Sequence, residues 1–105
     1  MKTKSIFFTV LILSQVIILA SCDKIKHSIK YAKAQAAYNQ GNLNKAIELY
    51  RELIKDNPGD AKLQWDLGTV YFSKGEKLRV QKQITELRKL NRNDLADDLQ
   101  QLSER

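Results

Sequence analysis

The chain has few of the residues on which catalytic, metal-binding and disulfide-bonded proteins depend. Its 105 residues include one cysteine, one histidine and one proline. A single cysteine, Cys22, cannot form an intrachain disulfide. A single histidine, His27, leaves no set of side chains arranged as a catalytic triad or a zinc site. We therefore predict no enzyme activity, no catalytic residue, no metal site and no cofactor.

Glycine and strand-forming patterns are scarce as well. Only four glycines are present, and none belongs to a glycine-rich phosphate loop. The adjacent pair Asp97 and Asp98 has no second acidic cluster, so we interpret it as solvated charge. No segment alternates apolar and polar residues as a half-buried strand does, whereas apolar residues recur at helical spacing. These features predict an all-α fold.

The N-terminus has the composition of an export signal. Residues 1–5 are basic, and residues 6–20 are almost wholly apolar. In a helix this apolar run extends about 23 Å, short of the roughly 30 Å hydrocarbon core that a spanning helix must cross. Residues 19–22, Leu-Ala-Ser-Cys, then resemble the lipobox of bacterial lipoproteins, an apolar residue and two small residues before a cysteine.

The resemblance implies that residues 1–21 are a signal peptide that is removed and that Cys22 is lipidated. Two or three acyl chains such as palmitate, at about 0.8 kcal/mol per buried methylene, give lasting anchorage. The mature chain is then expected in the bacterial cell envelope, anchored to the inner or the outer membrane without spanning it. The alternative is that Cys22 ends an uncleaved signal anchor.

The charge of the chain is basic, with 18 Lys and Arg against 12 Asp and Glu and a net charge of +6. Removal of Lys2 and Lys4 with the signal leaves 16 basic against 12 acidic residues, a net charge of +4. Exported proteins meet little nucleic acid, so this excess indicates anionic lipid and not nucleic acid as a partner. The predicted membrane-proximal basic residues are Lys24, Lys26, Lys30 and Lys33. A solvated helix face explains them equally well.

The remainder of the chain contains an internal repeat of 34 residues. Residues 27–60 align with residues 61–94, which places Gly41 over Gly75. Both glycines follow helical runs, and the Asn-Pro-Gly-Asp segment that ends at Asp60 stops one helix and caps the next. The expected helices cover residues 24–40, 44–56, 61–74, 77–91 and 95–103.

The repeat resembles the tetratricopeptide repeat, whose units are antiparallel helical hairpins that stack. The run from Gly41 through Ala46 to Tyr50 is similar to that family's G-x-x-x-x-A-x-x-x-[FY] pattern. The segment from Trp65 to Tyr71 is similar to W-x-x-L-G-x-x-Y, with the tryptophan one position closer to the leucine. The departures from the family pattern are Lys33 for leucine, Val80 for a small residue and Arg92 for the second proline.

The resemblance implies an organisation for the mature chain. Residues 22–26 form the lipidated cysteine and a short tether, and residues 27–94 form two repeats, 27–60 and 61–94. Residues 95–105 form a C-terminal capping helix, with Asp94 as its expected N-cap. Leu95, Leu99 and Leu102 give that helix one apolar face, which suits the exposed end of a helical array.

The resemblance also implies a binding groove, because the first helix of each hairpin lines the concave face in this family. The groove residues so identified are Tyr31, Gln35, Tyr38, Asn39, Trp65, Thr69, Phe72 and Ser73. Aromatic, amide and hydroxyl side chains of this kind dominate protein interfaces, although Tyr38 and Phe72 have the alternative of packing within the fold. Tyr31 and Asp66 stand where family members that bind C-terminal carboxylates need positive or amide groups, which disfavours that ligand.

The predicted function is a membrane-anchored adaptor that binds a protein or peptide of an envelope complex. Two alternatives stay open at this point. One is a structural lipoprotein that associates with itself as a homodimer. The other is a binder of anionic envelope polymer or lipid through the basic N-terminal helix.

Overall fold

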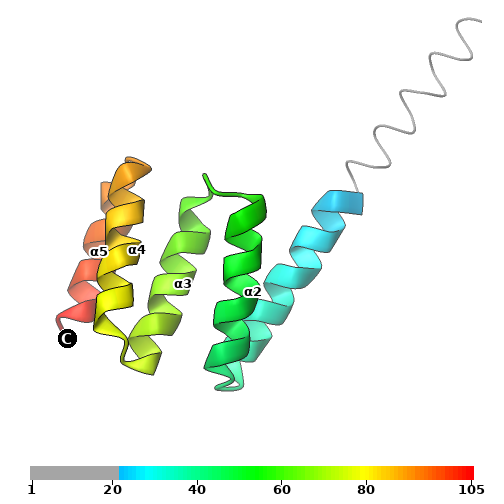
Figure 1. The fold of residues 1–105 in the computed structure, drawn as a ribbon, viewed down its shortest axis with the longest axis horizontal. Helices are drawn as coiled ribbons and strands as arrows, with labels where there is room; N and C mark the ends of the chain where they lie inside the picture. Colours follow the sequence, from blue (N-terminus) through cyan, green and yellow to red (C-terminus); the bar gives the residue numbers. More distant parts are fainter. Residues whose placement is uncertain (1–21) are drawn as a thin grey trace, which may run out of the picture.

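The computed structural model describes residues 22–105, and this part of the chain is a row of five helices. The first helix is described over residues 22–39. The helices that follow are α2 (Leu43–Asp56), α3 (Ala61–Lys74), α4 (Lys77–Lys89) and α5 (Asn93–Ser103). They run alternately up and down, and each lies beside its neighbours in sequence (Figure 1). The predicted all-α array of helical hairpins is confirmed.

The predicted signal peptide, residues 1–21, lies outside the described residues. The predicted tether, residues 22–26, is helical and continues without a break into the first repeat. Within residues 22–105, no helix is long and apolar enough to cross a membrane.

Three of the turns between helices have the same backbone conformation. Gly41, Gly75 and Asn91 have φ angles of 78°, 80° and 59°, in the left-handed region. At each turn this residue donates its N–H to a carbonyl three residues back, and the next N–H reaches five residues back, as in Asn42 to Ala37 at 2.9 Å. This pattern closes a helix C-terminus by satisfying its last carbonyl groups. Asn91 thus ends α4 at Lys89, two residues earlier than predicted.

Of the two predicted N-caps, the structure confirms Asp60 and contradicts Asp94. Asp60 caps α3 by accepting a hydrogen bond from the Lys62 N–H at 3.1 Å. The prediction of Asp94 as the N-cap of the last helix is wrong, because α5 begins at Asn93 and its cap position is Arg92. The Asp94 carboxylate instead accepts hydrogen bonds of 3.0 and 2.8 Å from the Arg92 guanidinium. These bonds lower the pKa of Asp94 to about 2.

The core lies between the helices and draws on each of α2 to α5. Its largest fully buried side chains are Leu53, Leu63, Val70, Val80, Leu87 and Leu99. Burying one such side chain contributes about 1.5–3 kcal/mol of transfer free energy. Within the described residues, α3 is the helix that packs against α2, α4 and α5 together, so it carries the centre of the core.

The capping role predicted for the last helix is confirmed by its packing. Ala96 and Leu99 are fully buried, and Leu95 and Leu102 are half-buried against the core. α5 approaches α3 at Gly68, where an added Cβ would overlap with Leu99 Cδ2. The absence of a side chain at Gly68 is therefore what lets the two helices come together.

The Gly68→Ala substitution is expected to destabilise the fold. The added methyl group must displace Leu99, and overpacking of this kind typically costs about 1–3 kcal/mol. The matched control is Gly59→Ala, because Gly59 has no atom within 4 Å of the added Cβ. Thermal unfolding followed by circular dichroism checks the difference. Equal midpoints for the two variants would contradict the close approach of α5 to Gly68.

Candidate functional site

A groove of about 680 Å³ lies across the face formed by the first helix, α3 and α5. Among the predicted groove residues, those that line it are Gln35, Tyr38, Asn39, Trp65, Thr69, Phe72 and Ser73. The lining residues that the sequence analysis did not assign to it are Tyr50, Lys62, Asp66, Asp98, Gln101, Leu102 and Arg105. A hollow therefore lies at the predicted positions, with α5 as a third wall, and its role in binding a partner stays a prediction.

The repeat explains why the first helix and α3 contribute matching side chains. Tyr38 and Phe72 are 34 residues apart, as are Asn39 and Ser73, so both helices present equivalent positions to the same face. The Tyr38 hydroxyl and Ser73 Oγ lie 3.0 Å apart and join the two helices across the groove floor. Phe72 is 37% exposed, whereas Tyr38 is half-buried. An aromatic surface is thus available to a ligand.

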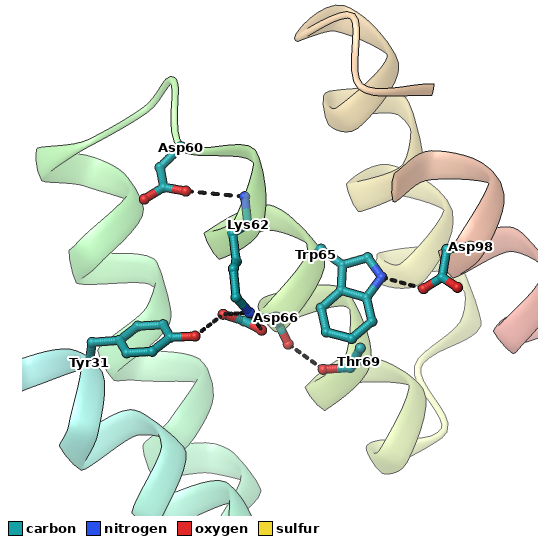
Figure 2. Close-up of polar contacts among 7 residues, drawn as sticks. All are labelled: Tyr31, Asp60, Lys62, Trp65, Asp66, Thr69 and Asp98. Carbon is teal, nitrogen blue, oxygen red and sulfur yellow. Dashed lines mark hydrogen bonds and ion pairs between the residues drawn. The ribbon is translucent and has the colours of Figure 1, made fainter. Parts of the chain in front are cut away.

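Asp97 and Asp98 are exposed, as their interpretation as solvated charge expects, but both also contact residues of neighbouring helices. Asp98 Oδ2 accepts a hydrogen bond from the Trp65 indole N–H at 2.8 Å (Figure 2). Asp97 forms an ion pair with Arg88 at 3.0 Å. α5 lies beside the second hairpin, where the first helix of a third hairpin would stand, and that position brings its residues to the groove. The one-sided apolar pattern of α5 signalled a cap but not this contribution.

The placement of Tyr31 differs from its prediction as a groove residue. Tyr31 lies at the end of the groove and lines a separate hollow of about 350 Å³ that includes His27 and Lys62. Its hydroxyl donates to Asp66 Oδ2 at 2.8 Å (Figure 2). Its ring packs edge-on against Tyr50 with the centroids 6.0 Å apart. Asp66 lies 35 residues away from Tyr31 in the sequence. A pattern of neighbouring residues therefore could not predict this hydrogen bond.

Lys62 and Asp66 form the charged end of the groove. Lys62 Nζ lies 3.1 Å from Asp66 Oδ1, 5.5 Å from the centroid of the Trp65 ring and 6.0 Å from that of Tyr31. The Asp66 side chain is only 9% exposed, so its charge is balanced inside the protein by Lys62 and by the Tyr31 hydroxyl. This end of the groove is therefore close to neutral.

The pKa shifts at this end follow from the same contacts. Burial raises the pKa of the Tyr31 hydroxyl, and its hydrogen bond to Asp66 raises it further. Partial burial lowers the pKa of Lys62, but hydrogen bonds to Asp66 and Tyr31 outweigh that effect and raise it overall. Both shifts favour the protonated forms of Tyr31 and Lys62.

The predicted membrane-proximal residues all lie on the first helix. Lys24, Lys26 and Lys30 line a second hollow of about 730 Å³, and Lys33 does not. Lys30 also forms an ion pair with Glu52 at 3.2 Å. Cys22 is exposed and carries a free thiol. Among residues 22–105, no group of His, Cys, Asp and Glu side chains is placed to hold a metal ion.

The middle of the chain matches a known protein family. Residues 31–78 match the tetratricopeptide repeat. The matched segment contains every groove residue that the first helix and α3 contribute. Tetratricopeptide repeats are generally scaffolds without catalysis, and they mediate protein–protein binding. No curated protein matches the sequence.

The Asp66→Asn substitution is expected to lower the pKa values of Tyr31 and Lys62. The pKa of Lys62 is higher in the folded protein than its ordinary value of 10.5. The contacts that raise it therefore stabilise the fold fully below pH 10.5, and this stabilisation is lost as the pH rises through the pKa of the folded protein. Ultraviolet titration of the tyrosines, with a Tyr31→Phe variant to assign the signal, measures the Tyr31 shift. Asp56→Asn, at an exposed position, is the matched control. An unchanged Tyr31 titration in Asp66→Asn would contradict the proposed coupling.

Proposed function

We propose that this protein is a lipid-anchored adaptor of the bacterial cell envelope whose groove binds a peptide or helical segment of a partner protein. The observation that carries the proposal is the groove of about 680 Å³ within a segment that matches the tetratricopeptide repeat. The groove suits a polypeptide because side chains of the first helix, α3 and α5 line it together. Its binding partner is a member of an envelope protein complex.

The side chains of the groove favour an uncharged stretch of polypeptide. Gln35, Asn39 and Gln101 supply amide groups that both donate and accept, as the peptide backbone requires. Phe72 supplies an exposed aromatic contact of the kind that often dominates interface energies. The charge of Lys62 is already balanced by Asp66, which weakens its attraction for a C-terminal carboxylate. The ligand is then an internal segment with apolar side chains.

The lipid anchor is proposed from the sequence that ends at Cys22. The Leu-Ala-Ser-Cys segment at residues 19–22 resembles a lipobox. Cys22 is exposed, so nothing in the described fold blocks its modification. Acyl chains on this residue would hold the groove close to a membrane surface, where it would meet envelope proteins at high local concentration.

A Phe72→Ala/Asn39→Ala variant is expected to lose its partner. Removing an aromatic anchor from an interface commonly costs more than about 1 kcal/mol, and two such losses weaken binding by about tenfold or more. The measurement is a pull-down from solubilised membranes with wild-type and variant baits, read by mass spectrometry. The control is Leu78→Ala/Asn44→Ala, which removes exposed side chains outside the groove.

The proteins recovered by the three baits distinguish binding in the groove from binding elsewhere on the protein. A protein recovered by the wild type and by the control, but not by the groove variant, supports groove recognition and identifies the partner. Identical protein sets from all three baits would overturn it.

Acylation of Cys22 is expected in the full chain expressed in a bacterium. The N-terminal peptide of the mature protein should begin at residue 22 and carry the mass of a diacylglycerol group, as measured by mass spectrometry. The control is a Cys22→Ser/Ser28→Cys variant, which keeps one thiol but moves it away from the lipobox position. An unmodified Cys22 in the wild type would overturn the anchor and leave the groove proposal untouched.

A further inference from the structure

Within the described residues, the two ends of the helical row differ in whether a helix covers their apolar surface. At the C-terminal end, α5 buries Ala96 and Leu99 and turns polar residues to the solvent. At the N-terminal end, within the described residues, no helix covers the outer side of the first helix (Figure 1). An array of this kind needs a covering surface at each end.

The outer side of the first helix is apolar. Ile25 and Ile29 are 58% and 50% exposed, and Ala32 and Ala36 are exposed as well. Steps of four, three and four residues place these four side chains on one face of a helix. The opposite face of the same helix faces the core, where Ala34 and Ala37 are buried. The first helix is thus apolar on two faces, and only one of them is covered.

Charge separates the two ends of the row. The first helix, residues 22–39, contains four lysines and one acidic residue, Asp23. The last segment, residues 93–105, contains four acidic residues and one arginine, Arg105. A protein with this charge distribution is drawn to an anionic surface with its N-terminal end first. Lys24, Lys26 and Lys33 flank the exposed isoleucines in sequence.

Chain continuity brings the same face to a membrane. The helix is unbroken from Cys22 to residue 39, so no flexible segment separates Cys22 from the fold. At about 1.5 Å per residue, Ile25 and Ile29 lie only about 5 and 11 Å along the helix axis from Cys22. An attachment to lipid at residue 22 therefore leaves the exposed isoleucines within reach of the bilayer interface.

We propose that the outer face of the first helix, Ile25, Ile29, Ala32 and Ala36, lies on an anionic lipid surface. The isoleucines enter the interface between headgroups and acyl chains, and Lys24, Lys26 and Lys33 contact lipid phosphates. The membrane then serves as the N-terminal cap of the array, and α5 is the helix farthest from it. The groove opens sideways, parallel to the membrane, toward neighbouring envelope proteins. This inference rests on the proposed lipid anchor at Cys22.

The test places one fluorescent label on the exposed face. Full-length acylated protein carrying Ile29→Cys is labelled at that thiol with an environment-sensitive dye and reconstituted into vesicles of phosphatidylglycerol and phosphatidylethanolamine. Spin-labelled lipid in the same vesicles should quench the dye and its emission should shift to the blue. The matched control is Leu78→Cys, because Leu78 is 88% exposed but lies on α4. Its dye should behave as it does in water.

The lysines are tested in the same assay. The Lys24→Gln/Lys26→Gln/Lys33→Gln variant should lose most of the blue shift and quenching at residue 29 in anionic vesicles. The control variant Lys77→Gln/Lys82→Gln/Lys89→Gln changes the net charge equally on α4 and should keep both signals. Loss in both variants, or in neither, would contradict a specific contact of the first helix with lipid phosphates.

Two outcomes would overturn the proposal. A dye at residue 29 that stays water-exposed in vesicles shows that lipid does not cover this face. A dye that is shielded equally without lipid, and only at high protein concentration, shows that a second copy of the chain covers it. Failure of the anchor is seen separately, because the mass of the N-terminal peptide reports acylation of Cys22. The same label in a Cys22→Ser background then reports on the face alone.

Discussion

Burial of α3 is the constraint on which the rest of the structure depends. This helix packs against α2, α4 and α5, so its apolar residues point in more than one direction. Leu63, Leu67 and Val70 belong to the core, whereas Trp65 and Thr69 line the groove. A single helix thus holds the fold together and presents the binding surface. Any change that loosens its packing alters the groove as well.

The balance of charge inside the groove follows from that position. Asp66 projects from α3 into a nearly closed site, where an uncompensated carboxylate would be costly. Lys62, one turn earlier on the same helix, and Tyr31, on the neighbouring helix, supply the compensating charge and hydrogen bond. The polar groups that give the groove its shape are consequently occupied with one another. The amide groups, the exposed Phe72 ring and the exposed Arg105 side chain remain as groups available to a ligand.

Because the array has only two repeats, burial of apolar surface at its two ends matters for its stability. Two hairpins bury less apolar surface than the three that usually give an independent array. α5 supplies part of the missing burial through Leu99, which reaches α3 over Gly68. The first helix leaves Ile25 and Ile29 uncovered at the other end. The basic first helix and the acidic last segment make the two ends unlike in charge as well as in packing.

The sequence alone determined the helices, the turns and the faces that the repeat dictates. Gly41 and Gly75 identified two turns because a left-handed φ angle is a local property of glycine, and the resemblance to the tetratricopeptide repeat implied the groove positions of the first helix and α3. Asn91 closed a third turn in the same conformation without so clear a signal, which moved the end of α4 and the start of α5.

The tertiary structure decided the contacts between residues far apart in the chain. It placed Asp98 against Trp65 and joined Tyr31 to Asp66, pairs that are 33 and 35 residues apart. It also made α5 a wall of the groove. Periodicity specifies which face of a helix is apolar, but the side chains that meet across helices depend on how closely and at what angle the helices pack. That geometry was fixed by packing contacts such as the one between Gly68 and Leu99.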